Sequence, residues 1–202
     1  RVRVRTRDGK EAEGRGSMPL GNVWAFPPRF VPVDASLAAM KALAARAAED
    51  TMAWTLCAHP IDLSVALEPE YKRLAGIVSD ELKLDVPIPD LCTLVTTSPI
   101  DAAIHDAFGK ANGINCYNAL GPEFVSNDLS AYLGDEFAGK YLDAYVWEKP
   151  QASIPLYHLV GALDPLTDAD IDKRLDDGMP ETLPEWIRAD GLTHLKVKLH
   201  GD

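Results

Sequence analysis

Two short apolar segments near the C-terminus, IPLYHLV (154–160) and THLKVKLH (193–200), constrain the fold more than any other feature. The sequence between them is acidic and helical in part, and Thr167 is a suitable helix N-cap. Parallel strands need a long connection, so a strand, a helical crossover and a second strand predict a parallel βαβ unit. The preceding segment EKPQAS (148–153) has the composition of a linker.

The first 17 residues, RVRVRTRDGKEAEGRGS, predict a β-hairpin. Asp8-Gly9 is a strong tight-turn pair, and the flanking residues alternate as strand residues do. Arginines at alternate positions from 1 to 7 predict one solvated strand face. Residues 18–28 contain three prolines and predict a loop, in which we expect Trp24 and Phe26 to pack on the core.

Three helices are predicted after this loop, over residues 35–50, 69–82 and 98–112, because apolar residues recur there at helical spacing. Residues 122–150 predict a further, interrupted helix. The expected caps and stops are Asp34 or Ser36, Ser98 with Pro99, and Gly113. The expected buried positions are Leu37, Met40, Leu43, Ala44 and Ala47 in the first helix, and Tyr71, Leu74, Val78 and Leu82 in the second.

Composition excludes some classes of partner. Acidic residues outnumber basic ones 31 to 20, giving a formal net charge of −11, which repels nucleic acid and anionic membranes. The three cysteines form no C-x-x-C pair, so we expect reduced, mostly buried thiols in a cytoplasmic protein. They are Cys57, Cys92 and Cys116.

Two lysines on the last predicted strand are the strongest candidates for chemistry. Lys196, Lys198 and His200 share one strand face, with neighbours about 6.6 Å apart. A lysine beside a second cation and partly removed from water loses its proton more readily, and can then act as a neutral base. The alternative is an edge strand whose lysines face water, and the pattern alone favours neither.

Other motifs carry less weight. GDEFAGKY (134–141) matches part of a phosphate-binding loop, but Tyr141 replaces the Ser or Thr that holds magnesium, so we reject nucleotide binding there. The five histidines are scattered, and we expect His105 to be structural. Their spacing makes a metal site built only from this chain improbable.

Three stretches, in order, resemble the mandelate racemase and muconate lactonizing branch of the enolase superfamily. They are RVRVRTRDGKEAEGRG (1–16), SPIDAAIHDAFGKANGINCYNALG (98–121) and GLTHLKVKLHGD (191–202). The resemblance implies an α+β capping domain, a hairpin followed by helices, over residues 1–150. It also implies that residues 151–202 begin a (β/α)7β barrel related to the TIM barrel, whose remaining strands are absent. We therefore expect the chain to be a piece of a longer polypeptide and inactive alone.

The resemblance further implies a lyase or isomerase, an acid-sugar dehydratase or a racemase. By position, Lys198 would remove the proton α to a carboxylate and Lys196 would assist it. Enolase-type sites pair such a base with magnesium, whose acidic ligands would follow Asp202. The implied substrate is a small carboxylate such as a hydroxy acid or acid sugar, and the implied assembly is a homo-oligomer. The alternative is a non-catalytic binding or scaffold protein of the same fold.

Overall fold

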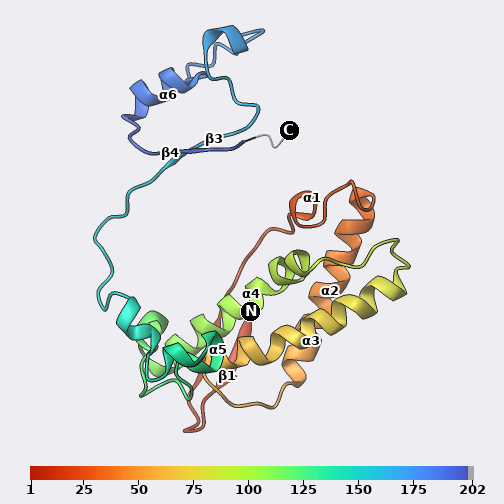
Figure 1. The fold of residues 1–202 in the computed structure, drawn as a ribbon, viewed down its shortest axis with the longest axis vertical. Helices are drawn as coiled ribbons and strands as arrows, with labels where there is room; N and C mark the ends of the chain where they lie inside the picture. The colour runs from red at the N-terminus through yellow and green to blue at the C-terminus, as the bar shows by residue number, and fades with distance from the viewer. Residues whose placement is uncertain (200–202) are drawn as a thin grey trace. The chain divides into compact units, whose positions relative to one another are not determined.

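The computed structural model describes residues 1–199 and divides the chain into two compact units, Arg1–Glu148 and Lys149–Asp202. The division lies two residues from the predicted boundary after residue 150. The first unit consists of a hairpin and helices, and the second contains a short parallel strand pair with one helix (Figure 1). None of the helices in the described part of the chain is long and apolar enough to cross a membrane.

The predicted N-terminal hairpin is confirmed. Strands β1 (Val2–Arg5) and β2 (Glu11–Gly14) pair antiparallel, with Val2 opposite Gly14. Gly9 adopts a positive φ of 85°, which glycine accepts without strain. The arginines of β1 are exposed and its valines are half-buried, so the solvated basic face is also as expected.

The hairpin packs directly on helix α4 (Asp90–Asn112), and two glycines permit the close approach. A Cβ at Gly14 would lie 2.0 Å from the Ala103 carbonyl oxygen, and one at Gly16 would lie 1.9 Å from that of Pro99. Both obstacles are backbone atoms, so no side-chain rotation relieves them. The missing side chains at positions 14 and 16 therefore set how closely hairpin and helix pack.

We expect Gly14→Ala to destabilise the protein by about 1–3 kcal/mol, because the hairpin must move away from α4. Gly76→Ala is the matched control, since a Cβ there meets no atom within 4 Å. Gly76 is exposed within a helix, so this change should stabilise by about 0.5–1 kcal/mol. Urea unfolding midpoints measure both effects, and equal midpoints for the two variants would contradict the tight hairpin contact.

Helix α2 (Val33–Ala53) contains the first predicted helix, but its start differs. Pro32 occupies the N-cap position, so the prediction of Asp34 or Ser36 as cap is wrong. Asp34 lies in the first turn instead, and the Ser36 hydroxyl donates to the Val33 carbonyl at 2.9 Å. Met40, Leu43 and Ala47 are buried as predicted, whereas Leu37 and Ala44 are only half-buried.

Helix α3 (Pro60–Glu81) begins nine residues before the predicted start at Pro69, which lies inside it. Its N-terminus is set by His59, whose side chain caps the helix, and by Pro60 in the first turn. Leu67 and Tyr71, on either side of Pro69, are both buried, and this packing opposes a helix break. Leu82 is the C-cap and 42% exposed, so its predicted inward position is wrong.

Helix α4 begins eight residues before the predicted start at Ser98. Ser98 and Pro99 lie within the helix, and the Ser98 hydroxyl donates to the Val95 carbonyl at 3.0 Å rather than capping. The predicted stop is confirmed, because Gly113 has a left-handed φ of 67°. Buried threonine hydroxyls in the first half of α4 bond to carbonyls four residues earlier, which satisfies them without water.

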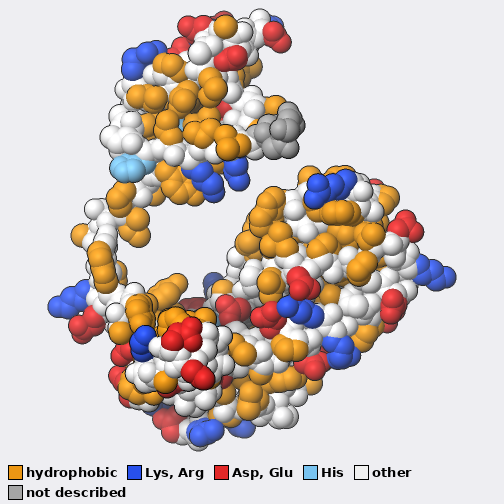
Figure 2. Space-filling model, in the orientation of Figure 1, with side chains coloured by type: hydrophobic (Ala, Val, Ile, Leu, Met, Phe, Trp, Pro, Cys, Tyr) orange, Lys and Arg blue, Asp and Glu red, His pale blue; other side chains and the backbone are white. Residues whose placement is uncertain are grey.

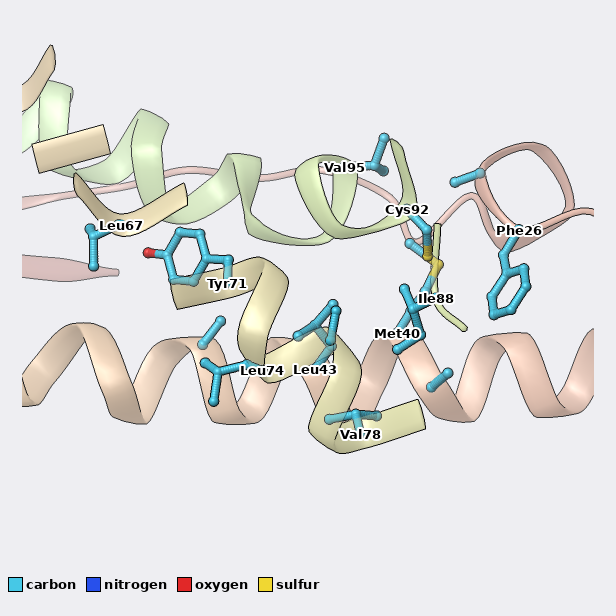
Figure 3. Close-up of a cluster of buried hydrophobic side chains, with 14 of the residues drawn as sticks. Phe26, Met40, Leu43, Leu67, Tyr71, Leu74, Val78, Ile88, Cys92 and Val95 are labelled. Atoms are coloured by element: carbon cyan, nitrogen blue, oxygen red, sulfur yellow. The ribbon is translucent and has the colours of Figure 1, made fainter. Parts of the chain in front are cut away.

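The core of the first unit forms where α2, α3 and α4 meet the short helix α1 (Asn22–Ala25), which interrupts the predicted loop (Figure 3). Phe26 is fully buried, as expected, but Trp24 is 64% exposed, so its predicted packing is wrong. The core side chains come from all four helices and the residues that flank them. They include Phe26, Met40, Leu43, Leu67, Tyr71, Leu74, Val78, Ile88, Cys92 and Val95.

The helix predicted within residues 122–150 is largely absent. The segment instead holds α5 (Ser130–Leu133) and the 3-10 turns η2 (Asp135–Phe137) and η3 (Leu142–Tyr145), and another such turn, η1 (Cys116–Asn118), precedes it. Glycines explain the interruption, because Gly134 and Gly139 both adopt positive φ.

In the second unit, β3 (His158–Val160) and β4 (Leu195–Val197) are parallel, as predicted, and α6 (Leu183–Asp190) lies between them in sequence. Both strands are shorter than expected, and His200 lies outside the described residues. The expected cap at Thr167 is confirmed at the 3-10 turn η4 (Asp168–Asp170).

A capping box, formed by Thr182 and Glu185, starts α6. The Glu185 carboxylate accepts hydrogen bonds from the backbone of Glu181 and Thr182 at 2.9 and 3.1 Å. These two N–H groups, together with the Arg174 guanidinium, lower the pKa of Glu185 to about 2. The N-terminus of α6 is therefore held by a carboxylate that stays ionised across the physiological range.

Candidate functional site

The candidate site is the parallel strand pair that carries the two lysines. Leu159 is opposite Lys196 in the register, and Val160 is opposite Val197. The Lys198 amide donates to the Val160 carbonyl at 2.9 Å, so the ladder extends beyond the last β4 residue. Lys196 thus lies in the middle of β4, and Lys198 lies directly after its carboxyl end.

The two faces of this strand pair have different surroundings. The His158 ring lies against Trp186 of α6, with ring centroids 5.3 Å apart, and Val160 is only 3% exposed. Because successive strand residues alternate, Leu159 and Lys196 belong to the opposite face, and so does Lys198. The two lysines therefore share the face that α6 does not cover.

An aromatic ring lies close to the first lysine. The Lys196 ammonium is 5.4 Å from the centroid of the Tyr157 ring, within the range of a cation–π contact. Tyr157 is 58% exposed and comes directly before β3. This contact positions a cation on the open face of the strand pair, where it can meet an anionic ligand.

Both lysines are exposed, and residues 149–199 of their own unit do not enclose them. Large apolar side chains are exposed across the same unit, and Figure 2 shows such side chains gathered on its visible surface. A two-stranded sheet is marginal in water without further strands or covering helices. The exposed apolar positions are Ile154, Leu156, Tyr157, Leu159, Leu163, Leu166, Leu175, Met179, Ile187, Leu195, Val197 and Leu199.

The described residues do not fit a magnesium ion on their own. No group of three or more His, Cys, Asp or Glu side chains in residues 1–199 is arranged to hold a metal. Two carboxylates of the second unit are engaged elsewhere, because Asp164 accepts from the Gly161 amide and Asp170 from the Thr167 amide. Any magnesium ligands would have to come from outside the described part of the chain.

The segment that partly matches a phosphate-binding loop is occupied by its own contacts. The Gly139 amide donates to the Asp128 carboxylate at 2.7 Å, and the Lys140 ammonium lies 5.0 Å from the Phe137 ring centroid. A carboxylate already takes the amide that a phosphate would need, which agrees with rejecting nucleotide binding there.

The remaining predicted residues are scattered. His105 pairs with Asp101 on the same helix, with Nδ1 and Oδ1 3.3 Å apart, as expected of a structural histidine. Cys92 is buried, but Cys57 is exposed and Cys116 half-buried, so the expectation of mostly buried thiols is wrong. An open hollow of about 530 Å³ lies by Arg7 and residues 53–57, and neither lysine lines it.

His59 is 4% exposed and caps α3, a role that was not predicted from the sequence. The dipeptide His59-Pro60 was the available signal, because proline is frequent in the first helical turn.

Comparisons of the chain with protein-family models, curated protein sequences and solved structures find no match. The candidate site is therefore defined by the contacts described above.

Proposed function

We propose that this protein abstracts the proton α to a carboxylate, as an acid-sugar dehydratase or a racemase of the enolase superfamily. The observation that carries the proposal is the placement of Lys196 and Lys198. Lys196 lies within the parallel strand β4 and Lys198 directly after its carboxyl end, both on the face opposite the crossover helix. In (β/α) barrels the crossover helices lie outside, and the carboxyl ends of the strands hold the chemistry.

In this proposal the two lysines have separate roles. The Lys198 amine takes the α-proton, and the Lys196 side chain, held over Tyr157, pairs with the substrate carboxylate. Return of a proton to the opposite face gives an epimer, whereas loss of a β-hydroxyl gives a keto acid. Magnesium would be held by acidic side chains that residues 1–199 do not supply.

The same proposal covers the fold. Residues 1–150 would form the capping domain, and the parallel pair β3–β4 would begin a (β/α)7β barrel. The hairpin packed on α4 and the uncovered apolar side chains around β3 and β4 support this interpretation. The competing function is a non-catalytic scaffold of the same fold, which the exposure of both lysines favours.

Proton exchange in heavy water tests the proposal on the native protein that contains this chain. Hydroxy acids and acid sugars are incubated with the protein and magnesium, and mass spectrometry follows deuterium at the α-carbon. We expect exchange with at least one substrate, its loss on chelation, and its return when magnesium is added back. A folded protein that catalyses no exchange across the panel supports the scaffold instead.

A further inference from the structure

His59 is a buried histidine whose two ring nitrogens are both engaged. The Ile61 amide donates to Nδ1 at 3.2 Å, and Nε2 lies 2.9 Å from the Ala119 carbonyl oxygen. An amide can only donate and a carbonyl can only accept, so Nδ1 is unprotonated and Nε2 carries the proton. The ring is therefore neutral, and it joins the N-terminus of α3 to the segment that follows η1.

The surroundings of His59 disfavour a positive charge. The ring makes a T-shaped contact with Phe108 from α4, with centroids 5.0 Å apart, and burial lowers the pKa of His59. Two titratable groups face it, His105 from α4 and Asp62 from α3. The Asp101 carboxylate raises the pKa of His105, so His105 gains its positive charge before His59 does as the pH falls.

We propose that His59 makes an acid-sensitive contact between two segments, and that its protonation releases residues 114–121 from the N-terminus of α3. A second ring proton would point at the Ile61 amide, and the capping hydrogen bond would be lost. The charge would also be buried close to protonated His105. Ala119 and Leu120 are now buried at 0% and 7% exposure, and both would become accessible.

The direction of the pH effect follows from linkage. The unfolded chain protonates His59 near pH 6.5, while the folded chain does so at lower pH. The contribution of His59 to the stability of the fold is therefore complete above pH 6.5 and falls below it. The pair of His105 with Asp101 has the opposite pH dependence. Its contribution to stability is complete below pH 6.5 and is lost as the pH rises through the folded-state pKa of His105. Acid therefore weakens the contacts of His59, while the pair of His105 with Asp101 within α4 persists.

His59→Asn provides the matched test, because asparagine also caps helices but does not titrate near neutral pH. Hydrogen exchange of the whole protein is compared at pH 7 and pH 5 after correction for the intrinsic exchange rate. We expect opening of residues 59–63 and 114–121 to increase by up to about tenfold per pH unit below 6.5 in the unmodified protein. The variant should show no such increase there.

An equal acid-induced increase in His59→Asn, or none in the unmodified protein, would overturn the proposal. If the variant does not fold, the ring of His59 is titrated by NMR in the unmodified protein. A folded-state midpoint at or above 6.5 would also overturn it, since the neutral tautomer would then not be favoured.

Discussion

Replacing Lys198 with alanine is expected to lower α-proton exchange by roughly 10²–10⁴-fold, the usual contribution of a positioned general base. The lysine comes directly after β4, and its amide bonds to the Val160 carbonyl, so the backbone that carries it is held by the sheet. Alanine keeps that hydrogen bond and removes only the amine. The measurement is the rate of deuterium incorporation in the native protein with saturating magnesium.

Two further variants separate the roles of the lysine. Lys198→Arg keeps the charge, but a guanidinium does not deprotonate at accessible pH, so this variant should be as impaired as alanine. Lys173→Ala removes an exposed lysine of the same unit and should leave exchange unchanged. Full activity of Lys198→Arg would assign an electrostatic role instead, and unchanged exchange in Lys198→Ala would eliminate Lys198 as the base.

Phe26→Ala is expected to destabilise the first unit by about 3–5 kcal/mol, because a fully buried aromatic ring leaves a cavity when removed. Phe26 follows α1 directly and belongs to the cluster formed with α2 and α3. The relevant measurement is the urea midpoint of unfolding, with the slope checked for a two-state transition.

Trp24→Ala is the control for Phe26, since both aromatics belong to the same short stretch. Trp24 is 64% exposed, and its removal should change stability by no more than about 0.5 kcal/mol. A loss as large as that of Phe26→Ala would contradict the exposed position of Trp24 and indicate that another surface covers it in the native assembly.

The helix starts show where local signals are insufficient. Ser98-Pro99 has the pattern of a helix start, yet α4 continues through it, with buried Cys92 and Val95 in the turns before it. Pro69 likewise lies within α3, because buried Leu67 and Tyr71 anchor the helix on both sides. In both places packing against distant segments outweighs the local preference of serine or proline.

The site was predictable only in part. Strand alternation alone places Lys196 and Lys198 on one face. The parallel pairing of β3 with β4 follows from the strand–helix–strand order. Which face α6 covers depends on the contact of Trp186 with His158, residues 28 positions apart by number. The cation–π contact of Lys196 in β4 with Tyr157, which comes directly before β3, likewise leaves no local pattern.

The sequence by itself determined the features that depend on neighbouring residues. These are the Asp8-Gly9 turn, the left-handed stop at Gly113 and the alternation along β4. Only the tertiary structure decided that Phe26 rather than Trp24 is buried, and that the hairpin packs tightly on α4. The physical reason is that turns and caps are formed by adjacent backbone groups, whereas burial is decided by surfaces that meet after distant segments fold together.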